Sequence, residues 1–445
     1  MAIEWKSFGA SKEVSGSCHM VSVGTRKVLI DCGIFQGPGS AGRNREPFGF
    51  KPSELDAVIV THGHLDHIGR LPQLVKRGFE GKIYSTRATL ELAKLSFRDS
   101  VSIMRHEARR QGTEPLFGSE HVVQTLELWD GQLEYEQPLP ILPEVEVTPY
   151  DAGHILGSAQ LLLDCKDGDE RRRIAISGDM GDPDRPLACD PAPGPSAEWA
   201  VVESTYGQRD HRSHEESVRE FEEAICETFE RGGNVLVPTF ALQRAQELLW
   251  LLFQSWKSGR IPRKTQIFLD SPMATSATGI YRRHKHLLDK EARDAFGGDE
   301  DPFRFHALNY TRRPEESSAI RSVTSGAVIL AGSGMVTGGR IKDHLIDHLE
   351  RPESSVVFVG YQAEGTTGRD LIEGKSPVRI DGIRLRPEAK IHTIGGFSAH
   401  AGQTQLVRWV EQTGASRAYL VHGEEEPMEA LQSALEERGV EALKA

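Results

Sequence analysis

The chain has few cysteines, and their positions argue against a thiolate metal site or a disulfide framework. The five cysteines are scattered, odd in number and form no Cys-x-x-Cys pair. Basic residues are not in excess either, because 53 Lys and Arg face 65 Asp and Glu, and a net charge of −12 disfavours a broad non-specific DNA surface. No run approaches the roughly 18 apolar residues of a membrane span, and the first residues have no apolar signal core. We therefore expect a cytoplasmic protein with no membrane partner.

The 445 residues suffice for two or three domains. Residues 1–60 read as strands joined by glycine turns, and strands return at about 144–150, 159–165 and 173–177. Between about 213 and 360, helix-like stretches alternate with short strands. That alternation predicts a separate α/β domain with a mostly parallel sheet.

One short segment concentrates side chains that bind metals. The hydrophobic run 57–60 leads directly into it, and a helix-like pattern follows, so the segment lies where a buried strand ends. Imidazole nitrogen and carboxylate oxygen are natural ligands of zinc and similar ions. A loop of solvated histidines is the alternative, and three histidines beside one carboxylate make it the weaker one. The segment reads Thr61-His62-Gly63-His64-Leu65-Asp66-His67.

Two further candidate ligands follow later strands. His154 lies in a glycine-flanked loop after the strand that ends at Tyr150, and Asp179 follows the hydrophobic run 174–176. Each alone is weak evidence, because a single loop histidine is more often structural. With the first segment they can form a two-metal site, in which the first ion takes His62, His64 and His154, the second takes Asp66, His67 and one more ligand, and Asp179 bridges both.

Other strand ends carry charged residues and glycine-rich loops. Asp31 closes a strand and either caps a turn or supports a site at that edge. Glycine-rich loops follow two strands, at 332–340 and 360–369, and such turns suit phosphate oxygens or are simple tight turns. The first loop is not a Walker A motif, because Arg340 replaces the required Lys-Ser/Thr pair.

The histidine segment, with His154 and Asp179 after it, resembles the metal ligands of the metallo-β-lactamase superfamily. Later motifs resemble those of its β-CASP nuclease branch: Glu203 in Glu-Ser-Thr-Tyr-Gly, His400 in Gly-Phe-Ser-Ala-His-Ala and His422 in Val-His-Gly-Glu. The resemblance covers almost the whole chain and is close to prokaryotic relatives of the endonuclease subunit of the pre-mRNA 3′-cleavage complex. It implies an αββα sandwich at 1–206 and 380–445, with an inserted β-CASP α/β domain at 207–379.

The resemblance also implies roles for individual residues. His62, His64 and His154 would bind one zinc ion, Asp66, His67 and His422 a second, and Asp179 both; manganese could replace zinc. Asp31 would orient a ligand. Asp66, Glu203 and His400 would be catalytic, with His400 protonating the leaving 3′ oxygen and Glu203 fixing its imidazole. The alternative for Glu203 and His400 is a structural hydrogen bond between domains. Ser333, Arg340 and Arg369 are the candidates for gripping flanking phosphates, although the arginines could equally pair with acids.

The function implied is metal-dependent hydrolysis of single-stranded RNA in a cleft between the two domains, with endonucleolytic cleavage expected. A histidine at position 422 is similar to the RNA-acting members, whereas DNA-repair members typically carry valine there. A 5′-exoribonuclease is the first alternative. A small-molecule metallo-hydrolase is the second, disfavoured by the insertion, and a non-catalytic RNA-binding or scaffold subunit is the third, disfavoured because every expected ligand position is filled. The sequence has no coiled-coil seam and leaves a homodimer open.

Overall fold

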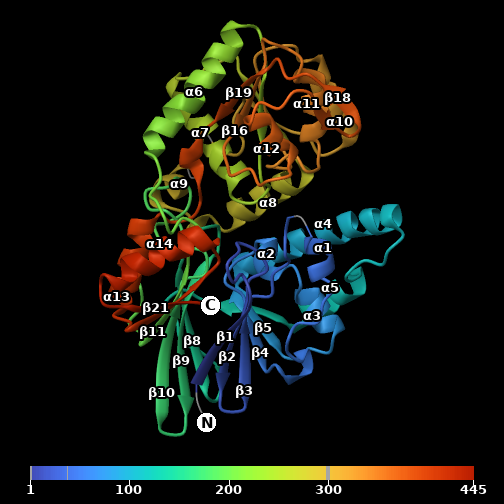
Figure 1. Ribbon diagram of the computed structural model, residues 1–445. Coiled ribbons are helices and arrows are strands. Elements are labelled where there is room, and N and C mark those ends of the chain that lie inside the picture. The colour runs from blue at the N-terminus through green and yellow to red at the C-terminus, as the bar shows by residue number, and fades with distance from the viewer. Residues whose placement is uncertain (1–2, 38, 297–300) are drawn as a thin grey trace. The chain divides into compact units, whose positions relative to one another are not determined.

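The computed structural model describes residues 3–37, 39–296 and 301–445. The chain divides into two compact units (Figure 1). Unit 1 comprises Met1–Asp184, Ala188–Asp210 and Ala399–Ala445, and unit 2 comprises Arg185–Leu187 and His211–Ser398. Each unit has its own sheets and its own hydrophobic core.

Two sheets form the centre of unit 1. The first has the strand order β1-β2-β3-β4-β5-β6, and β3 to β6 run parallel. Its strands are Ile3–Gly9, Cys18–Val23, Arg26–Ile30, Ala57–Ile59, Lys82–Thr86 and Trp129–Leu133. The second has the order β21-β20-β11-β10-β9-β8-β7, with β10, β11, β20 and β21 parallel. In chain order its strands are Leu139–Leu142, Val145–Asp151, Ala159–Asp167, Glu170–Ile176, Trp199–Glu203, Arg417–Val421 and Glu441–Lys444.

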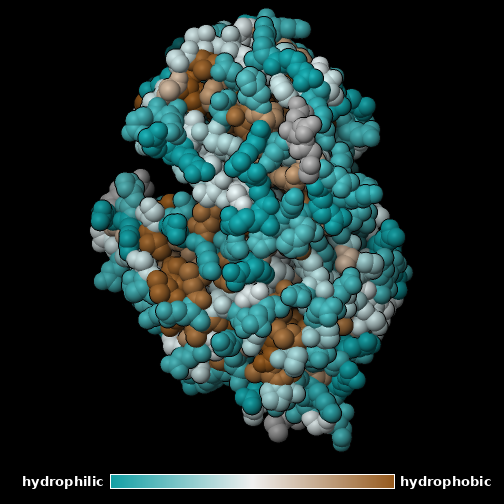
Figure 2. Space-filling model, turned by 180° about the vertical axis from the view of Figure 1, so that it is seen from behind, coloured by the Kyte–Doolittle hydropathy of each residue, from teal (hydrophilic) through white to brown (hydrophobic). Residues whose placement is uncertain are grey.

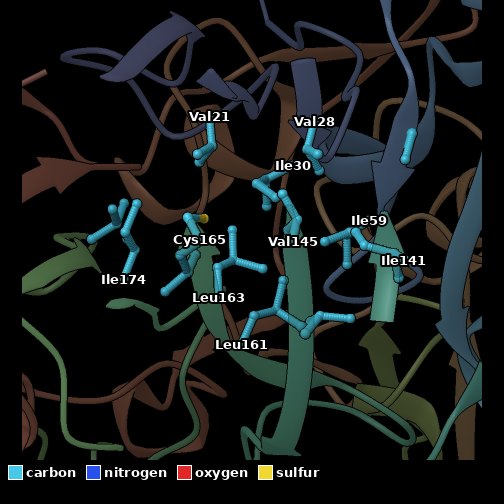
Figure 3. Packing of buried hydrophobic residues seen from close by; sticks show 14 of the residues in the cluster. Val21, Val28, Ile30, Ile59, Ile141, Val145, Leu161, Leu163, Cys165 and Ile174 are labelled. Carbon is cyan, nitrogen blue, oxygen red and sulfur yellow. The ribbon is translucent and has the colours of Figure 1, made fainter. Parts of the chain in front are cut away.

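A hydrophobic core joins the inner faces of these two sheets (Figure 3). Leu161, Leu163 and Cys165 alternate along β9 and are fully buried, because every second side chain of a strand points to the same face. In Figure 3 they lie opposite Val28 and Ile30 of β3. This packing fixes one sheet against the other, and so it fixes the strand ends that carry the candidate ligands.

Helices cover the two outer faces of unit 1. Apolar residues of α2, α3 and α4 pack on the first sheet, and those of α13 and α14 pack on the second, which gives the layer order helix–sheet–sheet–helix (Figure 1). The helices of this unit are α1 (Ser40–Arg43), α2 (Leu65–Ile68), α3 (Leu71–Lys76), α4 (Arg87–Gln111), α5 (Ser119–Leu128), α13 (Gln403–Thr413) and α14 (Glu425–Glu436).

Unit 2 is an α/β unit around a parallel sheet of order β14-β13-β15-β12-β16-β19. Its strands are β12 (Val235–Pro238), β13 (Gln266–Asp270), β14 (Leu308–Tyr310), β15 (Ala327–Ala331), β16 (Ser355–Phe358) and β19 (Lys390–Thr393), and β17 (Val378–Ile380) and β18 (Ile383–Leu385) form a separate hairpin. Its helices are α6 (His214–Glu230), α7 (Arg244–Ser258), α8 (Pro272–Arg283), α9 (Lys290–Ala295), α10 (Pro314–Ala319), α11 (Ile341–His348) and α12 (Thr367–Ile372).

The predicted fold class, an α/β protein with an αββα sandwich and a second, mostly parallel sheet, is confirmed. The expected domain limits of 207 and 379 differ from those of unit 2, because β19 extends the parallel sheet beyond residue 380 by pairing with β16.

The face shown in Figure 2 is mostly hydrophilic, with separate hydrophobic patches. Among the described residues, no helix combines the length and the apolar character that crossing a membrane requires.

Candidate metal centre and active site

The candidate ligands lie where strands of unit 1 end. His62 and His64 follow β4, and His64 is the N-cap residue of α2. Asp179 and His422 follow β10 and β20, which run parallel in one sheet with β11 between them. Because parallel strands direct their carboxyl ends to the same edge, ligands from distant parts of the sequence meet there.

His62, His64, His154 and Asp179 form the first group of ligands, and their ligand atoms all lie within 4.8 Å of one another. The Nδ1 atom of His64 lies 3.1 Å from Nε2 of His62 and 3.2 Å from Nε2 of His154. Nitrogen ligands of a tetrahedral zinc, with bonds of about 2.0–2.1 Å, lie roughly 3.3 Å apart. The three imidazole nitrogens therefore have the spacing that one zinc ion requires.

Hydrogen bonds orient the rings of this group. The Thr61 hydroxyl donates to Asp31 at 2.8 Å, so it accepts from His62 Nδ1 at 3.1 Å. The carbonyl oxygen of Ala399 lies 3.1 Å from His154 Nδ1 and accepts its proton. Both rings then present the lone pair of Nε2 to the centre, which is how metal-binding histidines are commonly held.

Asp66, His67 and His422 form the second group. His67 Nε2 lies 3.3 Å from His422 Nε2, which is itself 3.6 Å from Asp66 Oδ2. Asp179 lies between the two groups, because its Oδ2 is 3.5 Å from His62 Nε2 and its Oδ1 is 3.3 Å from His67 Nε2.

Asp179 provides the test of whether a metal fits. Its Oδ1 is buried and makes no hydrogen bond of good geometry among the described residues, although His67 Nε2 lies 3.3 Å away. A buried carboxylate oxygen without a donor is costly unless a cation compensates it. Together with the nitrogen and oxygen donors that converge there, this oxygen fits a bound divalent cation.

The Asp31 carboxylate sets the orientation of His67. Its Oδ2 lies 2.7 Å from His67 Nδ1 and accepts that proton, while its Oδ1 accepts the backbone N–H of Thr61 at 2.8 Å. Asp31 and His422 have φ angles of 60° and 52°, in the left-handed region that non-glycine residues rarely adopt. Such backbone strain is typical of functional sites.

Two glycines allow the ligand loops to approach each other. A Cβ at Gly33 would lie 1.5 Å from the carbonyl oxygen of Asp66, and a Cβ at Gly181 would lie 2.0 Å from that of Gly153. Neither contact is compatible with a side chain. The loop after β3 is thus held against the turn that carries Asp66 and His67.

Burial favours the neutral form of three imidazoles of the centre, whereas a fourth, His67, lies where positive charge is stabilised. Burial lowers the pKa of His62 and His154 well below the ordinary value, and that of His64 to about 4. Burial also lowers the pKa of His67, but Asp179 and Asp31 more than offset this and hold it well above the ordinary value. His67 Nε2 therefore lies where positive charge is favoured, as a proton or as a metal ion.

Glu203 and His400 form a second feature at the same edge of unit 1. His400 Nδ1 lies 3.1 Å from both carboxylate oxygens of Glu203, which is fully buried and also accepts from Met180 N–H at 2.7 Å. Burial lowers the pKa of His400, but the Glu203 carboxylate outweighs it and raises this pKa to about 9. The imidazole is therefore a cation at neutral pH, and 22% of its side chain is exposed.

The three residues predicted to bind substrate lie in unit 2 and have partners there. Ser333 accepts from the backbone N–H of Thr337 at 2.9 Å. Arg340 donates to buried Asp270 at 2.6 Å, and Arg369 pairs with Glu373 at 2.6 Å. A role for these residues in substrate binding stays a prediction.

Sequence reasoning missed two hydroxyl groups and the role of Gly33. Thr61 links Asp31 to His62, and the Ser177 hydroxyl accepts from the Glu203 N–H at 3.0 Å. Thr61 could have been suspected, because it directly precedes His62 at the end of a buried strand. Nothing distinguishes Ser177 or Gly33 in the sequence, since serines and glycines are common after strands.

Three family models match the chain. Residues 12–161 match the metallo-beta-lactamase superfamily, residues 245–371 match the Beta-Casp domain, and residues 384–444 match the Zn-dependent metallo-hydrolase RNA specificity domain. A crystal structure of a protein of unknown function from Enterococcus faecalis V583 has the same fold, with a TM-score of 0.56 at 12% identity, covering 99% of this chain and 97% of that one.

Curated relatives are similar over nearly the whole chain. Ribonuclease TTHA0252 of Thermus thermophilus is 42% identical over 437 residues, which is 98% of this chain and 96% of that protein. Transcription termination factor FttA of Methanosarcina mazei is 32% identical over 94% of this chain, and the match spans 66% of that longer protein. FttA of Methanocaldococcus jannaschii is 33% identical with the same coverage. The chain therefore belongs to the β-CASP nuclease family of the metallo-β-lactamase superfamily.

Proposed function

We propose that this protein is a metal-dependent ribonuclease that hydrolyses phosphodiester bonds of single-stranded RNA. The observation that carries the proposal is the arrangement of two ligand groups around the buried carboxylate of Asp179. The similarity to a ribonuclease over 98% of the chain supports RNA as the substrate and disfavours the small-molecule hydrolase.

The ligand set suits two zinc ions, with manganese as a substitute. His62, His64 and His154 would hold one ion, Asp66, His67 and His422 the other, and Asp179 would contact both. Bound divalent cations supply Lewis-acid activation of water and of a phosphate oxygen. The matched model of a Zn-dependent metallo-hydrolase domain supports zinc as the metal.

His400 is the proposed general acid. Its Nδ1 proton is bound by Glu203, so its Nε2 proton can pass to the 3′ oxygen as a water oxygen bonds to phosphorus and the P–O3′ bond breaks. The pKa of about 9 keeps this acid protonated at neutral pH, and the same positive charge stabilises the phosphate as negative charge develops on it. Glu203 acts as a positioning residue, since the buried carboxylate fixes the ring and raises its pKa.

Asp31, Ser333, Arg340 and Arg369 have supporting roles in the proposal. Asp31 orients His67, and Ser333, Arg340 and Arg369 contribute to phosphate binding in unit 2. We place the enzyme in the reducing cytoplasm, which agrees with the five free cysteines of the chain. A homodimer is compatible with the proposal and is not required by it.

The expected cleavage is endonucleolytic. The test uses zinc-loaded protein with a circular RNA and with linear RNAs of the same sequence, labelled at either end and carrying a 5′-hydroxyl or a 5′-monophosphate. Cleavage of the circle into linear products supports an endonuclease. Release of mononucleotides from 5′-monophosphate RNA, with the circle intact, would instead support a 5′-exonuclease. If no RNA of any form is cut, the proposed function is wrong.

A further inference from the structure

Only two aromatic side chains in the described part of the chain are strongly exposed. Phe240 is 44% exposed and Tyr361 is 54% exposed, whereas every other described Phe, Tyr and Trp is buried or half-buried. An exposed aromatic ring loses the free energy of burial, about 25 cal/mol per Å² of apolar surface. Two such rings in one unit therefore call for a functional explanation if they also lie together.

The two rings belong to neighbouring loops of unit 2. Phe240 follows β12 and Tyr361 follows β16, and these two strands pair in parallel at the centre of the sheet. Adjacent strands lie about 4.7–4.9 Å apart, so both loops leave the same short stretch of the sheet edge. In open parallel sheets, ligands commonly bind at this carboxyl edge.

Phe240 rests on a glycine of a third loop, which follows β15 on the other side of β12. A Cβ at Gly334 would lie 2.8 Å from Cδ2 of the Phe240 ring, so the backbone there approaches the ring as only glycine allows. A Cβ at Gly360, the residue before Tyr361, would lie 3.9 Å from Cε2 of the same ring, and 44% of the Phe240 side chain is exposed.

Gln362 ties the two glycine-rich loops together. Its side-chain amide donates to the carbonyl oxygens of Gly334, at 3.0 Å, and Gly360, at 3.1 Å. The side chain is 3% exposed, so these hydrogen bonds are shielded from water. Gly360 and Gln362 flank Tyr361 in the sequence. The hydrogen bonds of Gln362 therefore fix the segment that carries Tyr361 relative to Gly334, on which the Phe240 ring rests.

The surroundings of the rings favour a nucleobase over an apolar protein surface. The Ser333 and Thr337 hydroxyls lie on the same loop as Gly334, 3.1 Å from each other, and Thr337 is exposed. The loops beside the two rings, at 332–340 and 360–369, are thus rich in glycine and hydroxyl residues. Every base has a flat π face that stacks on such rings whatever its identity.

We propose that Phe240 and Tyr361 form a stacking platform that binds bases of single-stranded RNA. The inference rests on the proposed function, because the ligand is the proposed substrate. It adds a binding site within unit 2 that tolerates any sequence and that operates without metal. Gln362 is the positioning residue of the platform.

The test measures RNA binding by the full chain in EDTA, so that the result does not depend on catalysis. Fluorescence anisotropy gives the Kd of a labelled 12-nucleotide RNA and of the same strand with abasic sites. Phe240→Ala and Tyr361→Ala should each raise the Kd for the normal strand about fivefold or more, and the double variant further. Tyr361→Phe should bind like the wild type, because it keeps the ring.

Two controls separate stacking from general damage. Ile383→Ala removes another exposed hydrophobic side chain of unit 2, 46% exposed and on the separate β17–β18 hairpin, and should leave the Kd unchanged. The wild type should bind the abasic strand as weakly as the double variant binds the normal strand. Equal Kd values for the wild type and the double variant, or no preference for bases over abasic sites, would overturn the platform.

The same preparations distinguish this inference from the proposed function. If the zinc-loaded wild type cuts RNA and the double variant has an unchanged KM and Kd, the platform is wrong and the ribonuclease stands. If the rings govern RNA binding in EDTA but the loaded wild type cuts no RNA, the platform stands and the proposed catalysis fails. Binding of an apolar peptide in place of RNA at these rings would also overturn the platform.

Discussion

Asp31 determines which nitrogen of His67 faces the other candidate ligands. Its Oδ2 accepts the Nδ1 proton at 2.7 Å, which leaves Nε2 facing Asp179 and His422. The Thr61 hydroxyl donates to the same oxygen and aligns His62 at the same time. One buried carboxylate therefore orients candidate ligands from both groups.

Replacing Asp31 by Asn should weaken metal binding. Asn fits the space, but its NH₂ group would face the Nδ1 proton of His67, so the proton moves to Nε2 and blocks that ligand. We expect zinc affinity to fall about 10- to 100-fold at one of two sites. Competition with a chromophoric chelator measures this change.

Asp270→Asn is the matched control for that experiment. Asp270 is also buried and also accepts from a histidine, His344, at 2.7 Å, but it lies in unit 2. Its variant should bind zinc as the wild type does. Equal zinc affinity in Asp31→Asn and the wild type would show that the carboxylate has no part in metal binding.

Among the candidate ligands, those that directly follow a hydrophobic strand were the easiest to predict from the sequence. His62, Asp179 and His422 each follow a hydrophobic run, so their type and their place at a sheet edge could be read from the sequence. Thr61 and Ser177 could not, because a hydroxyl becomes informative only when its partner, Asp31 or Glu203, is seen beside it. The ligand assignments themselves stay predictions until a metal is measured.

Among the elements, the loop after β3 is held against the turn that begins α2. The N–H of Cys32 donates to the His67 carbonyl oxygen at 2.7 Å, and the N–H of Ile34 donates to that of Leu65 at 2.9 Å. The absence of a side chain at Gly33 permits this contact. Backbone hydrogen bonds therefore fix the position of this turn, in addition to the side-chain contacts of Asp66 and His67.

Gly33→Ala should displace that turn and reduce both stability and zinc affinity. The added methyl group would meet backbone atoms of Asp66, which cannot rotate away. We expect a loss of roughly 1–3 kcal/mol in the free energy of unfolding of unit 1, measured by urea denaturation. Gly42→Ala, which has open space around the new Cβ, is the control and should be nearly neutral. An equal effect of both substitutions would contradict the packing argument.

In unit 2, the side chain of Asp270 links four elements. From the end of β13 it accepts from Arg340, from His344 on α11, from Ser317 on α10 and from Thr311 after β14. Burial raises the pKa of Asp270, but these hydrogen bonds outweigh it and hold the pKa well below the ordinary value of 3.8. The lowered pKa means that the ionised carboxylate stabilises the folded unit.

The sign of this effect gives a pH prediction. An acid with a lowered pKa stabilises the fold at pH values above its unfolded pKa, and this stabilisation is lost as the pH falls below about 4. Asp270→Asn should therefore lower the free energy of unfolding by roughly 3 kcal/mol at pH 7, and the difference should shrink below about pH 4. Hydrogen exchange of peptides from β13, read by mass spectrometry in urea, measures this difference in the free energy of unfolding. Asp381→Asn, at an exposed ion pair, should change little, and a pH-independent gap for Asp270→Asn would contradict the account.

Over the whole chain, the sequence predicted the fold class and most long elements. The strands expected at about 144–150 and 159–165 correspond to β8 (Val145–Asp151) and β9 (Ala159–Asp167). Short elements such as β14 and β18 were missed, since three residues carry no periodicity. That β19 belongs to the sheet of unit 2 depends on its pairing with β16, which is a long-range property.

The division into two units predicts that metal stabilises only one of them. All candidate ligands belong to unit 1, and binding to the folded state alone stabilises it by about 2.7 kcal/mol at a free metal concentration of 100 Kd. Zinc added to EDTA-treated protein should slow hydrogen exchange in peptides of β4, β10 and β20, by up to about 100-fold. Peptides of β12 and β15 should not change. Equal protection of both units, or none, would contradict the assignment of the ligands.

Removal of the His400 imidazole tests whether this centre hydrolyses RNA with that residue as the acid. The rate of cleavage of a fluorescent single-stranded RNA and the zinc content are measured on the same samples of wild type, His400→Ala and the control His106→Ala, an exposed histidine of α4. We predict equal zinc in all three, wild-type cleavage by His106→Ala, and a rate about 10²- to 10⁴-fold lower for His400→Ala. Cleavage at the wild-type rate by zinc-loaded His400→Ala would contradict the account.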